Sequence, residues 1–231
     1  MNDARHRGAL VEGFTPPPAP GPAVIEGRFM RLERLDAVRH ATELHRANGG
    51  ADEVWDYMGY GAFDTLDAYR DWQTTMAQLS DPFFYAIRDA ASGKVAGLAA
   101  YLRIEPAHGV IEIGHIQLSP ALQRTAAASE ALMAMIRWAF ETGYRRVEWK
   151  CDALNAPSRR AALRLGFVFE GVFRKHMVVK GRNRDTAWFA ITDTEWPALR
   201  TAYDRWLSPD NFDGASRQRE SLSALTKGDG R

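Results

Sequence analysis

The sequence has almost no cysteine and no excess of charge of either sign. Its 231 residues contain one cysteine, Cys151, which cannot form an internal disulfide, so we expect a reducing compartment such as the cytoplasm. The formal net charge is +1, so there is no overall field that would attract nucleic acid or a membrane surface. We therefore expect neither of these as a partner.

Long apolar runs are also missing. No window approaches the roughly 20 apolar residues that cross a bilayer, and the first residues lack the basic stretch and apolar run of a secretory signal. The six histidines are scattered without metal-ligand spacing, so we expect no metal site. An apolar content of 45% and a charged content of 26% instead indicate an ordinary globular protein, whose length fits one domain with extensions.

Composition divides the chain into three parts. Residues 1–23 form a proline-rich arm that can hold neither a helix nor a central strand, and we expect a semi-rigid linker or an arm on a neighbouring surface. Residues 24–195 alternate strand and helix patterns and are expected to form the folded domain. Residues 196–231 are expected to add a C-terminal helix and a polar tail.

The order of the elements predicts an α+β fold with a mixed sheet, because strands alternate with helices and several strands are joined by hairpin turns. The patterns predict strands over 24–35, 83–88, 94–104, 110–118, 146–152, 167–173, 175–180 and 187–192. Helices are predicted from 37 to 48, 64 to 79, 128 to 142, 157 to 165 and 195 to 207.

A turn of small residues follows the predicted strand 110–118 and opens a helix. Backbone N–H groups at a helix N-terminus are unpaired and carry partial positive charge, so such a turn can bind a phosphate. Taken alone, the pattern also fits an ordinary helix start. The turn consists of Gln123, Arg124, Thr125, Ala126, Ala127, Ala128 and Ser129.

Over about residues 26–195 the chain resembles the GNAT superfamily of acyl-CoA-dependent N-acyltransferases. The turn fits the family's pyrophosphate motif, Gln/Arg-x-x-Gly-x-Gly/Ala, except at Ala126, where the family usually has glycine. Residues 155–158 (Asn-Ala-Pro-Ser) and 164–171 (Arg-Leu-Gly-Phe-Val-Phe-Glu-Gly) resemble signatures of the ribosomal-protein (RimJ/RimL-type) N-acetyltransferases. A positive φ at Ala126 would cost about 1–2 kcal/mol, so we predict a negative, helical φ there.

The resemblance implies an α/β/α-type GNAT fold with a mixed, mostly antiparallel central sheet and helices on both faces. Strand 110–118 would separate from strand 146–152 at the cofactor site, and Ile116, Gln117 and Leu118 would bind the pantetheine arm of acetyl-CoA. The Gln123–Ser129 turn would bind the pyrophosphate, and Asn155 the CoA chain.

Acyl transfer from a thioester to an amine requires a base, a proton donor and stabilisation of developing charge. The resemblance implies that Ser158 protonates the leaving thiolate, although Ser158 and Asn155 could simply be first-turn and capping residues. For the base it points to Glu170. Glu112 is the alternative, because strand alternation places it on the same face as Ile116. Either could be a solvated carboxylate, and the reaction could also need no dedicated base.

The acceptor site is implied to lie between the loop after the first helix and the last hairpin. The candidates there are Trp55, Tyr57, Met58, His176 and Trp188. Basic residues in that hairpin favour an acceptor that is acidic or carries a carboxylate or phosphate, or a succinyl donor, but they also fit a solvated turn.

The sequence thus predicts transfer of an acetyl group from acetyl-CoA to a primary amine on a small molecule or a protein N-terminus, directly within a ternary complex. A succinyl-CoA-dependent N-acyltransferase and a non-catalytic acyl-CoA-binding module are the alternatives. Trp196 and Trp206 could form a homodimer interface or seal the core. Cys151 has no readable His or Asp partner and is expected to be inert.

Overall fold

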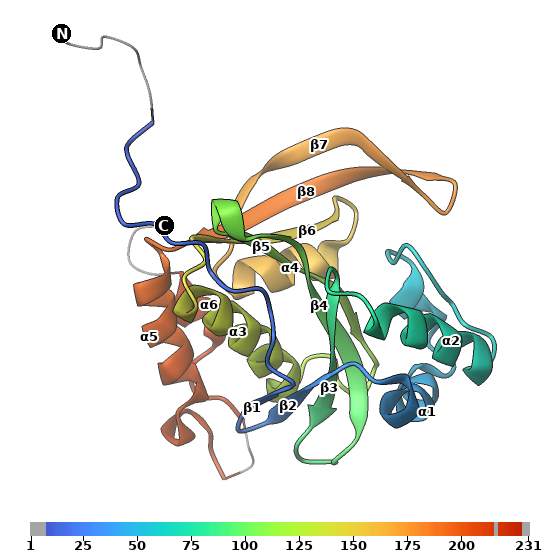
Figure 1. Ribbon diagram of the computed structural model, residues 1–231. Coiled ribbons are helices and arrows are strands. Elements are labelled where there is room, and N and C mark those ends of the chain that lie inside the picture. The colour runs from blue at the N-terminus through green and yellow to red at the C-terminus, as the bar shows by residue number, and fades with distance from the viewer. Residues whose placement is uncertain (1–7, 215–216, 228–231) are drawn as a thin grey trace, which may run out of the picture.

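A computed structural model describes residues 8–214 and 217–227 and shows one open sheet between two layers of helices (Figure 1). The described strands form an eight-stranded sheet in the order β1-β2-β3-β4-β5-β6-β8-β7. The strands are β1 (Val24–Glu26), β2 (Met30–Arg34), β3 (Phe83–Asp89), β4 (Val95–Glu105), β5 (Val110–Leu118), β6 (Arg146–Asp152), β7 (Val168–Val179) and β8 (Arg182–Thr192). The α-helices are α1 (Ala37–Asn48), α2 (Leu66–Ala77), α3 (Ala126–Glu141), α4 (Ala156–Arg164), α5 (Trp196–Leu207) and α6 (Leu222–Thr226).

The sheet is antiparallel except between β5 and β6, which run parallel. Those two strands pair only from Val110 to Glu112, against Arg146 to Glu148, and then diverge. The mixed, mostly antiparallel sheet and the splayed strand pair predicted from the sequence are therefore confirmed. The divergence leaves one side of the later part of β5 without a strand partner.

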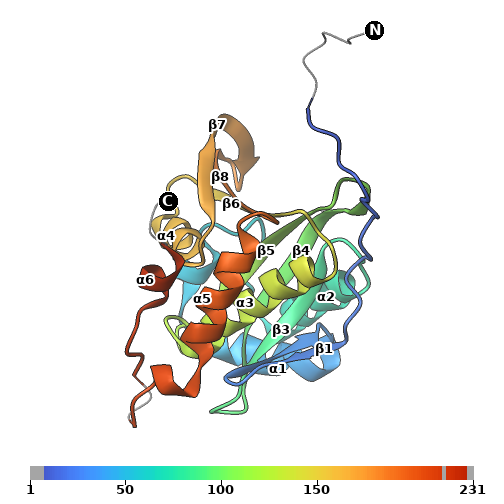
Figure 2. The same cartoon turned by 90° about the vertical axis from the view of Figure 1, so that its left-hand side faces the viewer.

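Helices cover both faces of the sheet, as the two views show (Figures 1 and 2). On one face α3 is buried along most of its length and is fixed to β4 by the Tyr101 hydroxyl, which donates to the Met135 carbonyl at 2.7 Å. On the other face α1 and α2 enclose a smaller aromatic core that includes Trp55, Tyr69 and Phe84. The site described below lies between these layers.

Side-chain caps fix where the helices near the site begin. Thr125 caps α3, because its Oγ1 accepts from the Ala128 amide at 3.1 Å. Asn155 caps α4 in the same way through the Ser158 amide, and Pro157 occupies the first turn, where no N–H is needed. The predicted bounds of α1, β5 and β6 match the structure.

Two strand predictions were wrong. The single strand predicted over 24–35 is a hairpin of β1 and β2, because the Glu130 carboxylate accepts from the amides of Arg28 and Phe29 and holds the turn. The two strands predicted over 167–180 form one strand, β7. Its register against β8 shifts between Phe173 and Met177, and Lys175 lies in the left-handed region with φ 52°.

The proline-rich arm lies on the surface of the same chain. The hydroxyls of Tyr85 and Tyr144 donate to the carbonyls of Pro22 and Pro18, at 2.9 and 3.1 Å, and Pro17 and Pro20 are buried. These contacts hold the arm against the sheet and the end of α3.

In the C-terminal extension, α5 packs beside α3 and α6 packs beside α4 (Figure 2). Trp196 and Trp206 are buried in the core, and the Tyr203 hydroxyl donates to the Leu165 carbonyl at 2.6 Å. The two tryptophans thus seal the core. No helix within residues 8–214 and 217–227 is long and apolar enough to cross a membrane.

Candidate active site

A cavity of about 230 Å³ lies where β5 and β6 diverge. Its walls come from β4, β5, β6, the start of α4, the loop after α1 and the β7–β8 hairpin. Segments far apart in the sequence therefore meet at one opening in the sheet. The lining residues are Tyr57, Met58, Gly59, Leu102, Arg103, Glu112, Ile113, Gly114, His115, Ile116, Trp149, Lys150, Cys151, Asp152, Asn155, Ser158, Met177, Val179 and Arg184.

Glu112 is a buried carboxylate in the lining of this cavity. It is 3% exposed, and its Oε2 lies 2.6 Å from Arg103 Nη1 and 3.0 Å from Lys150 Nζ. Lys150 also contacts Glu148 at 2.7 Å, and its ammonium lies 3.8 Å from the centre of the Trp188 ring. Two cations therefore fix the Glu112 carboxylate at the point where the strands separate.

Ser158 also lines the cavity, from the first turn of α4. Its Oγ accepts a hydrogen bond from Trp149 Nε1 at 3.0 Å, so its own hydrogen remains able to donate into the cavity. Burial raises the pKa of the neighbouring Cys151 thiol, and the Ser158 hydroxyl only partly opposes that rise. Cys151 thus stays a thiol near neutral pH and is a poor nucleophile, as its sequence context indicated.

A bulge reorients the backbone of β5 next to the cavity. Gly114 pairs with Ala100 and Gln117 with Leu98, so β5 has one more residue than β4 between these pairs. His115 in the bulge has a φ of 49° and its Nδ1 lies 3.2 Å from the Tyr60 hydroxyl. Burial lowers the pKa of His115 to about 4, so its imidazole is neutral near pH 7.

The N-terminus of α3 presents free backbone donors. Thr125 satisfies the Ala128 amide, whereas the amides of Arg124, Ala126 and Ala127 make no hydrogen bond within the described chain. Ala126 begins the helix without a positive φ, which confirms that prediction, and the left-handed residue of the turn is Arg124, with φ 61°. Three free amides beside an exposed arginine fit a pyrophosphate group.

Two other side chains of the turn, Gln123 and Ser129, hydrogen-bond to nearby backbone carbonyls and stabilise the turn. Gln123 Nε2 donates to the Leu118 carbonyl at 3.1 Å, and Ser129 Oγ donates to the Thr125 carbonyl at 3.1 Å. Ile116 lines the cavity, but the Gln117 side chain faces away from it and pairs with Asn48, with 2.7 Å between Gln117 Nε2 and Asn48 Oδ1. Only the backbone of Gln117 is available on the cavity side.

The structure does not bring Glu170 into the cavity. Both of its carboxylate oxygens accept from the Arg146 guanidinium, at 2.8 and 2.5 Å, on the exposed strand β7. The hydrogen bonds from Arg146 lower the pKa of Glu170, although burial acts in the opposite direction. Because Glu170 does not line the cavity, it is poorly placed to take a proton from an amine there.

The expected acceptor residues separate into two groups. Tyr57 and Met58 line the cavity, and the Tyr57 hydroxyl donates to the Leu154 carbonyl at 3.3 Å. Trp55 is buried behind the loop, whereas His176 pairs with Thr186 and lies outside the lining. Trp188 does not line the cavity, but its ring contacts the ammonium of Lys150, which does.

Sequence reasoning missed Arg103 and Lys150 and considered Arg184 only as one of several basic hairpin residues. Arg184 Nε donates to Thr186 Oγ1 at 3.2 Å, and its two terminal nitrogens make no hydrogen bond within the described residues. Arg103 faces Glu112 after a register shift in β4, and the side chain of Lys150 is only 5% exposed despite its charge. No local pattern signals either position.

Comparison with known proteins decides the family. The model of the acetyltransferase (GNAT) domain matches residues 30–168, which is more than half of the chain. The chain belongs to the GNAT acetyltransferase family. This membership makes the protein an acyl-transferring enzyme and confirms the α+β fold expected from the resemblance. Among the described residues, no three His, Cys, Asp or Glu side chains gather closely enough to hold a metal ion.

Several GNAT relatives cover most of the molecule. A GCN5-related N-acetyltransferase from Brucella melitensis is 47% identical, with a TM-score of 0.91 over 94% of this chain and 100% of that one. A probable GNAT acetyltransferase from Chromobacterium violaceum is 42% identical, with a TM-score of 0.79 over 84% and 98% of the two chains. The ribosomal-protein-serine acetyltransferase of Escherichia coli K12 is 35% identical over 83 residues, 36% of this chain and 46% of that protein. The match therefore spans less than half of that relative, although it confirms the resemblance to the ribosomal-protein type.

Proposed function

We propose that this GNAT protein transfers an acetyl group from acetyl-CoA to a primary amine in a ternary complex. The observation that carries the proposal is the cavity between β5 and β6, whose lining includes a fixed carboxylate and a hydroxyl donor. The turn at the start of α3 supports an acyl-CoA donor, because its three free amides suit a pyrophosphate.

Glu112 is the base in this proposal. The amine nitrogen attacks the thioester carbonyl, the C–N bond forms, and Glu112 accepts the amine proton directly or through a water molecule. Glu112 is preferred to Glu170 because it lines the cavity, whereas Glu170 is held by Arg146 outside it. Arg103 and Lys150 keep the carboxylate in place, as positioning residues.

Ser158 and the β5 bulge complete the proposed reaction. As the C–S bond breaks, the Ser158 hydroxyl, oriented by the hydrogen bond from Trp149, gives its proton to the departing thiolate. Ser158 then takes a proton back from solvent, to which Glu112 releases the proton that it accepted from the amine. The backbone beside His115 has no strand partner toward β6, so an N–H there is available to the developing oxyanion. Direct transfer needs no acyl-cysteine, consistent with the raised pKa of Cys151.

The position of Arg184 favours an acceptor that carries an anionic group close to its amine. The terminal nitrogens of Arg184 have no partner among the described residues, and in the cavity wall they could bind a carboxylate bidentately. Such an acceptor could be a free amino acid or an N-terminus followed by an acidic residue. Because the one cysteine is buried and unpaired, we place the reaction in a reducing compartment such as the cytoplasm.

Thiol release from acetyl-CoA, with succinyl-CoA as the alternative donor, tests this proposal against a panel of amines. Amino acids and their amides form matched pairs that differ only in the carboxylate. We expect release with acetyl-CoA and a preference for the free carboxylate that Arg184→Ala abolishes. Binding of both donors without release of thiol from either would instead support a non-catalytic acyl-CoA-binding module. Faster release of thiol from succinyl-CoA would indicate that the carboxylate near Arg184 belongs to the acyl donor and not to the acceptor.

A further inference from the structure

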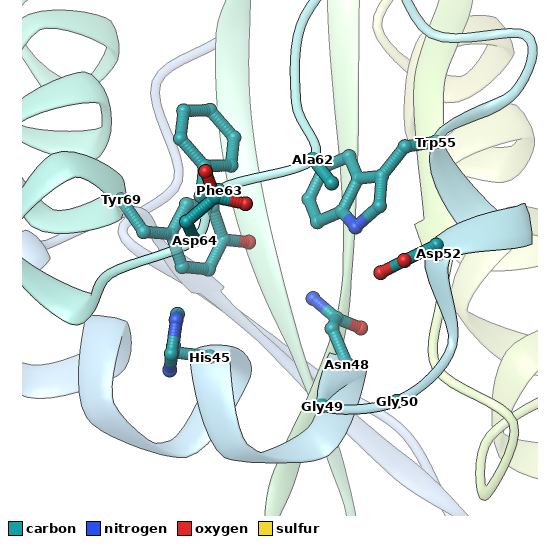
Figure 3. A pocket seen from close by; sticks show the side chains of 10 residues that line it. All are labelled: His45, Asn48, Gly49, Gly50, Asp52, Trp55, Ala62, Phe63, Asp64 and Tyr69. Atoms are coloured by element: carbon teal, nitrogen blue, oxygen red, sulfur yellow. The ribbon is translucent and has the colours of Figure 1, made fainter.

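A second cavity of about 210 Å³ lies behind the loop that follows α1 (Figure 3). It is formed by the end of α1, the loop between α1 and α2, and the start of α2. The same loop lines the acyl-transfer cavity with Tyr57 and Met58, whereas it lines this second cavity with Asp52, Trp55 and Phe63. Neither the proposed reaction nor the family match assigns a role to the second cavity.

The inner wall of this second cavity is aromatic. The ring centroids of Trp55, Phe63 and Tyr69 lie 4.8–5.8 Å from one another. The Gly61 backbone, with φ 72°, passes so close to Trp55 that a Cβ at that position would lie 2.6 Å from the indole. The aromatic wall is therefore held in place by the loop.

A buried hydroxyl without a hydrogen-bond partner points into this cavity. Tyr69 is 0% exposed, and its hydroxyl makes no hydrogen bond within the described residues. Figure 3 shows that it points between Trp55 and Asn48, into the space that the cavity occupies. Burial raises the pKa of Tyr69, and the amides of Gln73 and Asn48 oppose that rise without reaching the hydroxyl in hydrogen-bond geometry. An unpaired buried hydroxyl is costly unless something else binds it.

Two carboxylates stand at the mouth. Asp52 and Asp64 both line the cavity, and neither side chain forms a hydrogen bond or ion pair in the part of the chain that the structure describes. The amide of Asn48 is already paired with Gln117 on β5, so it forms a fixed polar floor. Unpaired negative charge beside aromatic faces is the environment in which proteins hold organic cations.

We propose that this second cavity binds a small organic cation, a primary ammonium attached to a short apolar or aromatic body. The rings of Trp55 and Phe63 contact the body, Asp52 and Asp64 face the ammonium, and the Tyr69 hydroxyl gains a partner. The volume exceeds the roughly 150 Å³ cavity that accommodates benzene, and it is far too small for CoA.

The test is calorimetric titration of the protein with 2-phenylethylammonium chloride, without any acyl donor. The neutral analogue 2-phenylethanol is the matched ligand. Asp52→Asn combined with Asp64→Asn removes the charge at the mouth, and Asp56→Asn is the control, because Asp56 lies on the same loop but lines neither cavity. Glu112→Gln is included because Glu112 lines only the acyl-transfer cavity, so a loss of affinity in this variant would place the ligand there.

We expect the double variant to weaken ammonium binding by about three- to tenfold, since each carboxylate is exposed. Asp56→Asn and Glu112→Gln should leave the affinity within about twofold, and 2-phenylethanol should bind more weakly than the ammonium. Tyr69→Phe should weaken binding without lowering the thermal midpoint, because its hydroxyl has no partner to lose.

Three results would overturn the proposal. One is the absence of binding up to about 10 mM ammonium, which would leave a cavity filled only by water. The second is equal affinity for the ammonium and the alcohol, or affinity unchanged in a folded double variant. The third is loss of binding in Glu112→Gln, which would place the ligand in the acyl-transfer cavity. Because no donor is present, these results are independent of whether the acetyltransferase reaction proceeds as proposed.

Discussion

Replacing Glu112 by glutamine should separate the roles of the two candidate carboxylates. The amide keeps the size of the side chain but cannot accept the amine proton. If Glu112 is the base, kcat/KM for the amine should fall by about 10²–10⁴-fold, the usual contribution of a positioned general base. Glu170→Gln is the matched control and should change kcat/KM by less than about threefold, since Glu170 contacts Arg146 outside the cavity.

The structure also predicts that the Glu112→Gln protein folds. Arg103 is about half exposed and can turn to water, and Lys150 keeps its contact with Glu148 at 2.7 Å. The variant therefore loses charge pairing without stranding a buried cation, and we expect a cost of about 1–3 kcal/mol in the free energy of unfolding. Urea unfolding measures this cost before any kinetic comparison is made.

A pH series distinguishes the loss of a base from a distorted site. Without Glu112 the reaction depends on amine that is already deprotonated in solution, and an α-amino group has a pKa of about 8. The rate of Glu112→Gln should rise about tenfold per pH unit below that value, more steeply than the wild type. A loss of less than about threefold in Glu112→Gln, together with a large loss in Glu170→Gln, would refute the assignment.

Three further predictions concern stability and cofactor binding. The hydrogen bonds from Arg88, opposed in part by burial, lower the pKa of Glu33 from 4.5 to about 2. Glu33 therefore contributes stability at neutral pH that is lost as the pH falls from about 4.5 to about 2. In urea unfolding, Glu33→Gln should lower the free energy of unfolding by about 3 kcal/mol at pH 7 and by almost nothing at pH 2. Arg124→Gly removes the strain of a left-handed φ, so the midpoint of thermal unfolding should rise by an amount equivalent to about 1 kcal/mol. Calorimetry should show weaker CoA binding, because the variant loses a cation beside the free amides of α3. An unchanged midpoint would contradict the strain argument. Gly166→Ala places a Cβ 2.4 Å from Leu199 at a φ of 90°, and should lower the free energy of unfolding by at least about 2 kcal/mol; a neutral result would mean that α5 can move away from the turn.

Local signals predicted the elements that are defined by their own residues. The predicted ranges 37–48 and 110–118 match α1 and β5, and the Asp36 side chain caps α1 by accepting from the amides of Val38 and Arg39. The hairpin of β1 and β2 was missed because its turn is held by Glu130, about a hundred residues away in the sequence. Long-range hydrogen bonds of this kind leave no local pattern.

The candidate site was predicted only in part for the same reason. Asn155 and Ser158 line the cavity and the predicted turn opens α3, because local capping sets the starts of both helices. The resemblance also pointed to Glu170, whose position next to Arg146 depends on how β7 pairs with β8 and β6. Which carboxylate faces the cavity is decided by the divergence of β5 and β6, a tertiary feature.

The proline-rich arm has a consequence for the order of events during synthesis. Its hydrogen bonds to Tyr85 and Tyr144 close chain segments of 63 and 126 residues, so the arm cannot dock until much of the domain has emerged. At about 5–20 residues per second, the later partner leaves the ribosome roughly 6–25 s after the arm does. During that interval the surfaces that Pro17 and Pro20 later cover are open to other proteins. The segment that is made first therefore docks late.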